Sequence, residues 1–135
     1  MKKEPRNNKV DHKSNNSRQV LGRWGEGLAA EFLVARGLEI LSKNFRTPDG
    51  EIDIIAKGGD DLIFVEVKTR RNTLYSFPEE AINDEKIEHL ESAAGWYLLQ
   101  HPEYENNWRL DVVTVIGTPD TGEPRVDWFE NVTAE

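Results

Sequence analysis

Hydrophobic and polar positions recur with different periods along this chain of 135 residues. Near the N-terminus, apolar residues return at steps of three and four, which predicts an amphipathic helix that begins at Ser17 as its N-cap and ends at Gly37. The apolar positions of this stripe are Leu21, Trp24, Leu28, Phe32 and Ala35. We expect the stripe to face a core, and it leaves Glu26 on a flank where the neighbouring side chains are small.

Shorter apolar segments follow this helix and predict strands. An extended segment covers residues 38–45, and Thr47-Pro48-Asp49-Gly50 after it is a strong turn signal. Residues 51–56 and 62–69 are rich in Ile, Val and Phe, and the polar loop between them, residues 57–61, contains two glycines. This pattern predicts a β-hairpin.

The second half of the chain changes period again. After Pro78, the helical spacing of Ile82, Leu90, Ala94 and Tyr97 on one inward face predicts a long helix that ends at the His101-Pro102 step. Residues 108–116 and 125–129 then predict two strands. The order of helix, three strands, helix and two strands predicts an α/β sandwich with a mixed sheet of about five strands and the hairpin near its centre.

Composition excludes several classes of protein. The length fits one domain, and the absence of cysteine excludes disulfide frameworks, thiolate zinc sites and a thiol nucleophile. No apolar run reaches the roughly 18 residues that a membrane span needs, so we expect a soluble, cytoplasmic protein without a membrane partner. The net charge of −8, from 17 basic and 25 acidic residues, argues against a general nucleic-acid coat protein.

The charge is distributed unevenly along the chain. Residues 1–25 hold seven Lys or Arg and two acids, whereas the remainder is strongly acidic. Because residues 1–17 contain almost no apolar side chains, we expect them to form a flexible basic tail ahead of a single domain over residues 18–135. Such a tail fits a nucleic-acid-binding arm and, equally well, a solubilising segment.

The predicted hairpin carries charges at positions that strands normally reserve for burial. If the hairpin is symmetric about its loop, Asp53 stands opposite Glu66, and Glu51 stands opposite Lys68. Two carboxylates that face each other across a strand pair repel, and a divalent cation between them would remove that repulsion. The alternative is a buried ion pair of Lys68 with Glu66 or Glu51, although such pairs are seldom net stabilising.

A magnesium site explains these charges. Mg²⁺ takes oxygen ligands and commonly uses one or two protein carboxylates, which Asp53 and Glu66 would supply, with the backbone carbonyl of Val67 as a third ligand. Lys68 would lie on the same face as Glu66, because side chains two residues apart in a strand share a face. A cation beside a lysine suits phosphodiester hydrolysis, since both stabilise the charge that develops on phosphate.

Several segments in a fixed order resemble a known family. The Asp…Glu-x-Lys pattern over residues 53–68 resembles the signature of restriction-endonuclease-like nucleases. The wider set resembles the small bacterial YraN-like family over about residues 20–116. Its motifs are Gly25-Glu26, Asn44-Phe45-Arg46, Gly50-Glu51-Ile52-Asp53, Phe64-Val65-Glu66-Val67-Lys68-Thr69-Arg70, Pro78-Glu79-Glu80-Ala81 with Lys86, and Asp111-Val112-Val113.

The resemblance implies a restriction-endonuclease-like three-layer fold, related to archaeal Holliday-junction resolvases, and a metal-dependent endonuclease activity with Mg²⁺ or Mn²⁺. By position, Asp53 and Glu66 match the metal ligands, Lys68 matches the catalytic lysine, and Glu26 matches a helical acid that some relatives place near the metal. Related resolvases are dimers, so a homodimer is expected. Asp111 receives no catalytic role.

Three further basic residues are candidates for nucleic-acid contacts. Lys86 lies on the inward stripe of the second helix, where a lysine either extends outward to solvent or meets a negative site. Arg70 and Arg71 follow the central strand and would contact strand phosphates, although a solvated loop explains them equally well.

Two functions therefore remain in competition. The first is a Mg²⁺- or Mn²⁺-dependent endonuclease that acts on DNA, including branched or structured forms. The second is a nucleic-acid-binding accessory module that keeps the fold with little or no turnover. The intact acid and lysine set favours the first, and the acidic body of the chain favours the second.

Overall fold

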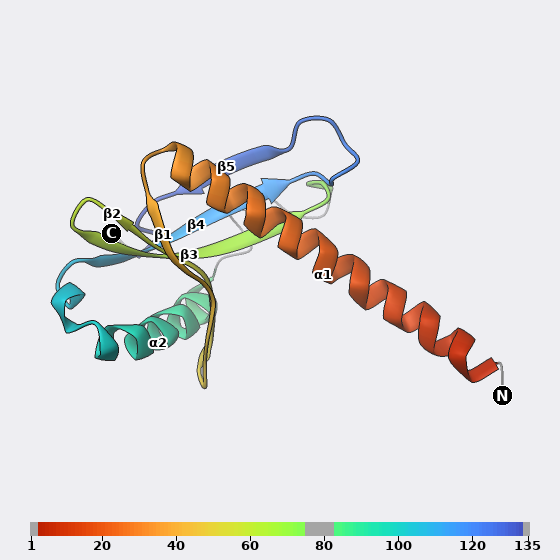
Figure 1. The fold of residues 1–135 in the computed structure, drawn as a ribbon, viewed down its shortest axis with the longest axis horizontal. Helices are drawn as coiled ribbons and strands as arrows, with labels where there is room; N and C mark the ends of the chain where they lie inside the picture. The colour runs from red at the N-terminus through yellow and green to blue at the C-terminus, as the bar shows by residue number, and fades with distance from the viewer. Residues whose placement is uncertain (1–2, 75–82, 134–135) are drawn as a thin grey trace.

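The computed structural model describes residues 3–74 and 83–133, with side chains from residue 17 onward, and it forms a five-stranded mixed sheet with one long helix on each face (Figure 1). The predicted α/β three-layer fold is confirmed. The elements are α1 Lys3–Ala35, β1 Glu39–Thr47, β2 Gly50–Gly58, β3 Asp61–Arg70, α2 Asp84–Gln100, the 3₁₀ turn η2 Pro102–Tyr104, β4 Trp108–Ile116 and β5 Arg125–Phe129.

The strands lie in the order β1-β2-β3-β4-β5, and only the β3–β4 pair is parallel. The β2–β3 hairpin has the symmetric register that the sequence predicts, as in the pair Ile54 and Val65. Its turn is tighter than predicted, because Gly58 pairs with Asp61 and leaves Gly59 and Asp60 as the two loop residues. Gly59 has a φ of +63°, which the primed turns of two-residue hairpins require.

Each face of the sheet has its own apolar core, as strand alternation requires. On the α1 face, Ala29 and Leu33 pack with Val65 and Val113. On the α2 face, Phe64 lies in the cluster that contains the buried residues Leu90, Ala93, Ala94 and Tyr97. The expected inward face of α2 is thus confirmed for its described residues, whereas Ile82 lies outside them. Within residues 3–74 and 83–133, no helix is long and apolar enough to cross a membrane.

The prediction that the first helix begins at Ser17 is wrong, because α1 begins at Lys3. No Gly or Pro interrupts residues 6–21, so the helix continues through Ser17 at a cost of only about 0.5 kcal/mol relative to alanine. Pro5 falls in the first turn, where the backbone N–H groups have no partner within the helix. Whether the segment before Ser17 is flexible stays a prediction.

The predicted stripe of α1 packs on the sheet in part, because Trp24, Leu28 and Phe32 are partly buried against the core. Ala29 and Leu33 are fully buried and Gly25 is buried, whereas Ala35 is exposed. A Cβ at Gly25 would collide with the side chain of Thr69 on β3. Close approach of α1 therefore depends on the small residues of the flank that carries Glu26, and this approach brings Glu26 to the sheet.

Candidate functional site

The candidate site lies at a fork between β2 and β3. These strands pair only from their turn to Ile54 and Val65, after which β2 stays with β1 and β3 stays with β4. Asp53 and Glu66 are the first residues past the last pair, so the gap opens at the two predicted acids. Oδ2 of Asp53 accepts a hydrogen bond of 2.8 Å from the backbone N–H of Val67, which takes the place of a ladder bond.

Two lysines from different elements meet Glu66. Its side chain is buried, and Oε2 lies 3.1 Å from Nζ of Lys68 on β3 and 3.2 Å from Nζ of Lys86 on α2. Of the two outcomes expected for Lys86, the meeting with a negative site is therefore the one observed. A direct contact of Lys86 with nucleic acid stays a prediction, because its side chain is partly exposed beside this ion pair.

The electrostatics of the fork are unfavourable for Asp53. Burial, followed by the negative charges of Glu66 and Glu26, raises the pKa of Asp53 from 3.8 to about 7, although the hydrogen bond from the Val67 N–H opposes the change. Near neutral pH, a large fraction of Asp53 thus carries a proton, which a bound cation would displace.

Glu26 joins the site from α1 through an asparagine. With its amide nitrogen turned toward the carboxylates, Asn44 donates hydrogen bonds of 3.2 Å to Glu26 and to Glu51. Burial, followed by the charge of Glu51, raises the pKa of Glu26. Sequence reasoning assigned Asn44 no role. Its φ of +55° within β1 is a conformation that asparagine tolerates better than most residues, but the sequence gives no sign that this position needs it.

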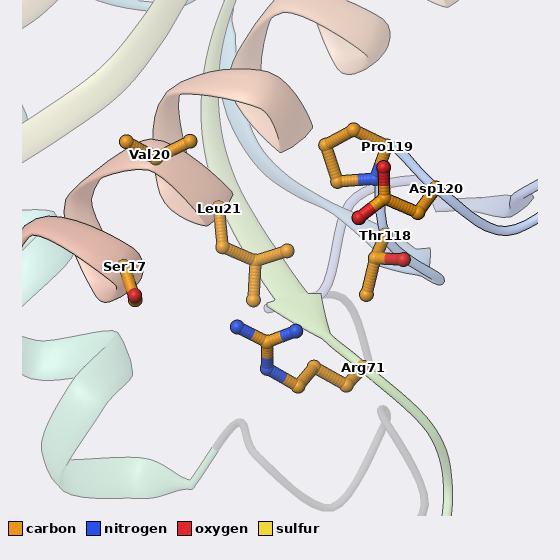
Figure 2. Close-up of a pocket in the computed structure, with 7 residues that line it drawn as sticks. All are labelled: Ser17, Val20, Leu21, Arg71, Thr118, Pro119 and Asp120. Carbon is orange, nitrogen blue, oxygen red and sulfur yellow. The ribbon is translucent and has the colours of Figure 1, made fainter. Parts of the chain in front are cut away.

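The remaining predicted residues lie in three different settings. The prediction that Glu51 stands opposite Lys68 is wrong. At that point β2 has separated from β3, and Glu51 pairs with Arg46 on β1. Arg70 lines a hollow of about 300 Å³ together with Lys68 and Glu26. Arg71 lines a neighbouring hollow of about 370 Å³, which shares Leu21 with the first, and its guanidinium group points toward α1 (Figure 2).

Asp111 contacts β5, and its setting is structural. The side chain is fully buried, and both oxygens accept hydrogen bonds from Arg109. The indole of Trp128 donates to Oδ2 at 2.9 Å, and the backbone N–H of Asn131 donates to Oδ1 at 2.8 Å. This carboxylate ties β4 to β5 and to the residues after β5.

The fork offers a small oxygen donor set for a metal. Within residues 3–74 and 83–133, no three carboxylate or imidazole side chains come together closely enough to hold an ion by themselves. Asp53 and Glu66 supply two carboxylates. In an antiparallel strand the N–H and C=O of one residue point toward the same neighbour, so the carbonyl of Val67 faces the fork with its N–H. Two carboxylates, one carbonyl and water fit Mg²⁺ or Mn²⁺, which retain several waters.

Comparison with known proteins places the chain in a family. The model of the family described as "Uncharacterised protein family UPF0102" matches residues 25–115. The chain belongs to this family. The UPF0102 protein of Beutenbergia cavernae is 38% identical over 116 residues, which cover 86% of this chain and 98% of that protein. The UPF0102 protein of Syntrophomonas wolfei is 45% identical over 96 residues, which cover 71% and 84% of the two chains.

UPF0102 is the YraN family, so the resemblance inferred from the ordered motifs is confirmed. The matched residues extend from Gly25 to Val115 and include Glu26, both acids of the fork and Lys68. The UPF0102 protein of Syntrophotalea carbinolica, 44% identical over 106 residues, covers 78% of this chain and 86% of its own length. The family description names no activity.

Proposed function

We propose that this UPF0102 protein is a divalent-metal-dependent endonuclease that hydrolyses phosphodiester bonds in DNA, including branched or structured forms. The observation that carries the proposal is the fork itself, where Asp53 and Glu66 adjoin and Lys68 contacts Glu66 at 3.1 Å. A purely structural role would not require two neighbouring acids at the point where two central strands separate.

Asp53, Glu66 and the carbonyl of Val67 are the groups that would hold Mg²⁺ or Mn²⁺. The bound ion would polarise a phosphate oxygen and lower the pKa of a bound water. Asp53 can serve as a ligand only in its ionised form, and its pKa of about 7 means that a proton must leave it first. Ion binding should therefore strengthen as the pH rises through 7.

The two lysines that contact Glu66 have different roles in this proposal. Lys86 comes from α2 and holds Oε2 of Glu66 from below the sheet, so we assign it a positioning role. Lys68 lies on β3 beside the hollow that also contains Glu26, and its ammonium group can orient water or neutralise the charge that grows on phosphate. Glu26, which lines the same hollow, is a further acid that can orient water.

One observation favours the second candidate function, a nucleic-acid-binding accessory module without turnover. Lys68 and Lys86 already place two ammonium groups within 3.2 Å of the same oxygen of Glu66, which neutralises this acid without a metal ion. In that function the fork is a self-contained ionic cluster, and the chain binds nucleic acid through other residues.

A cleavage assay tests the endonuclease. Purified protein is incubated with linear, flapped and four-way-junction DNA in the presence of Mn²⁺, beside the variants Asp53→Asn and Lys68→Ala. The matched controls are Asp127→Asn, an acid of β5 that pairs with Arg125, and Lys57→Ala on β2. We expect cleavage by the parent and the controls, and at least a hundredfold loss in the two site variants.

Cleavage that persists in both Asp53→Asn and Lys68→Ala would show that the site assignment is wrong. If the parent cleaves none of the three DNA forms yet binds them, the accessory function is the correct one.

A further inference from the structure

Two hollows adjoin along α1 on either side of the candidate site. The first, of about 300 Å³, lies between α1 and the end of β3, and the second, of about 460 Å³, lies between α1 and β1. Gly22 and Glu26 line both of them, so the two form one groove that passes the acid on α1. Its basic wall residues are Arg18, Lys68 and Arg70 in the first hollow and Arg23 and Arg46 in the second.

Three of the four arginines in this groove have no acidic partner among the described residues, whereas Arg46 lies 4.0 Å from Glu51. Outside it, Arg109 forms ion pairs with three acids and Arg125 pairs with Asp127 at 2.7 Å. Within residues 17–74 and 83–133, no carboxylate lies within 4.0 Å of Arg18, Arg23 or Arg70. In a chain with 25 acids and 17 bases, clustered arginines without acidic partners are the unexpected case.

The shape of the groove leaves room for a chain of phosphates beside the site. A Cβ built on Gly22 meets no atom within 4 Å, so the groove is open where its two hollows meet. A third hollow continues it past Leu21, which lines both the first and the third, and there the guanidinium group of Arg71 points toward α1 (Figure 2). Cationic groups thus extend away from the site in both directions.

We propose that this groove binds the sugar–phosphate backbone of a nucleic-acid strand on both sides of the phosphate that is cleaved. Arg18 and Arg70 hold phosphates on one side, and Arg23 with Arg46 holds them on the other. Guanidinium groups suit this role because they bind phosphate oxygens in pairs, and contacts of this kind carry no sequence information. The proposal rests on the proposed function for the phosphate at the fork, but it makes its own prediction about binding.

Binding without divalent metal tests the groove independently of hydrolysis. The probes are a fluorescein-labelled 20-nucleotide single strand and the corresponding duplex, and anisotropy gives Kd at 50 to 200 mM salt in EDTA. For the double variant Arg18→Ala/Arg70→Ala we expect Kd to rise about tenfold or more. The slope of log Kd against log salt should fall by about 2, one for each phosphate contact removed.

A glycine pair supplies a second test with a matched control. Gly22→Leu places a side chain into the open groove, whereas Gly27→Leu adds the same side chain at a helical glycine that does not line it. A Cβ built at either position meets no neighbouring atom within 4 Å, so we expect both variants to fold, which a thermal melt checks. We expect Gly22→Leu to weaken binding about tenfold or more, and Gly27→Leu and Arg125→Ala to bind like the parent.

The groove is refuted if the parent does not bind either probe, if Arg18→Ala/Arg70→Ala and Gly22→Leu bind like the parent, or if the control variants lose as much affinity. A parent that cleaves no DNA, but whose affinity falls in the two groove variants, supports the groove and contradicts the endonuclease. The two proposals therefore fail separately.

Discussion

Asp111 and the Asp53–Glu66 pair belong to the same sheet, with Asp111 and Glu66 buried and Asp53 partly buried, yet their carboxylates meet different partners. Asp111 accepts hydrogen bonds from a guanidinium group, an indole and a backbone amide, and all of these groups come from β4, β5 and the residue pair after β5. Asp53 has one backbone amide and a second acid beside it. Burial alone thus does not distinguish a structural acid from a candidate for function, whereas the balance of donors and charges around it does.

The strongest test of this contrast is Asp111→Ala. The substitution leaves the guanidinium group of Arg109 and the indole of Trp128 without their buried acceptor, so we expect a loss of about 3–5 kcal/mol in the free energy of unfolding. Urea denaturation measures it. Asp127→Ala, which removes an acid from a more exposed pair, should cost no more than about 1 kcal/mol. Equal costs in the two variants would contradict the structural role of Asp111.

Asp53→Asn should instead raise the free energy of unfolding. The pKa of Asp53 is about 7 in the folded state and near 3.8 in the unfolded state, so the folded state binds the extra proton between these values. Stability of the parent should therefore fall as the pH rises from about 4 to about 7 and remain low above it. Asn carries no charge, so Asp53→Asn should be more stable than the parent by on the order of 2 kcal/mol at pH 8.

Urea denaturation of parent and Asp53→Asn at several pH values between 5 and 8 checks this prediction. If the difference in unfolding free energy between the two proteins does not grow with pH, the pKa of Asp53 is not raised in the folded state.

The smallest expected effects concern the packing that brings Glu26 to the fork. Gly25→Ala places a methyl group against Thr69 of β3, and we expect a loss of about 1–2 kcal/mol. Gly27→Ala has open space and should gain up to about 1 kcal/mol from helix propensity. Thermal melts of both variants measure these changes in stability. A Gly25→Ala variant as stable as Gly27→Ala would mean that α1 does not depend on this close approach.

The strands were predictable because their signal is local. The bounds of β4 and β5 match the predicted segments, and the register of the β2–β3 hairpin follows from its central loop. The pairing of Glu51 with Lys68 was wrong because the register was extended past the point where β2 leaves β3. That departure depends on how β1 and β4 compete for the two strands, and no local pattern records it.

The first helix also shows where prediction from local sequence patterns fails. Ser17 carries a capping signal, but continued helical propensity before it is the stronger term, and α1 begins at Lys3. Part of the predicted stripe of α1 packs on the core, but the closest approach lies on its flank, where Gly25 and Ala29 have small side chains. In the site, the acids were found from their misfit with strand burial, and Asn44 was missed because its contacts join three separate segments.

Calorimetric titration with Mn²⁺ at pH 8, where Asp53 is ionised, tests the central claim most directly. We predict that the parent and Asp127→Asn each bind one ion at the fork, and that Asp53→Asn binds it at least a hundredfold more weakly. Equal binding by Asp53→Asn and the parent, or no binding by the parent, would contradict a metal site between Asp53 and Glu66.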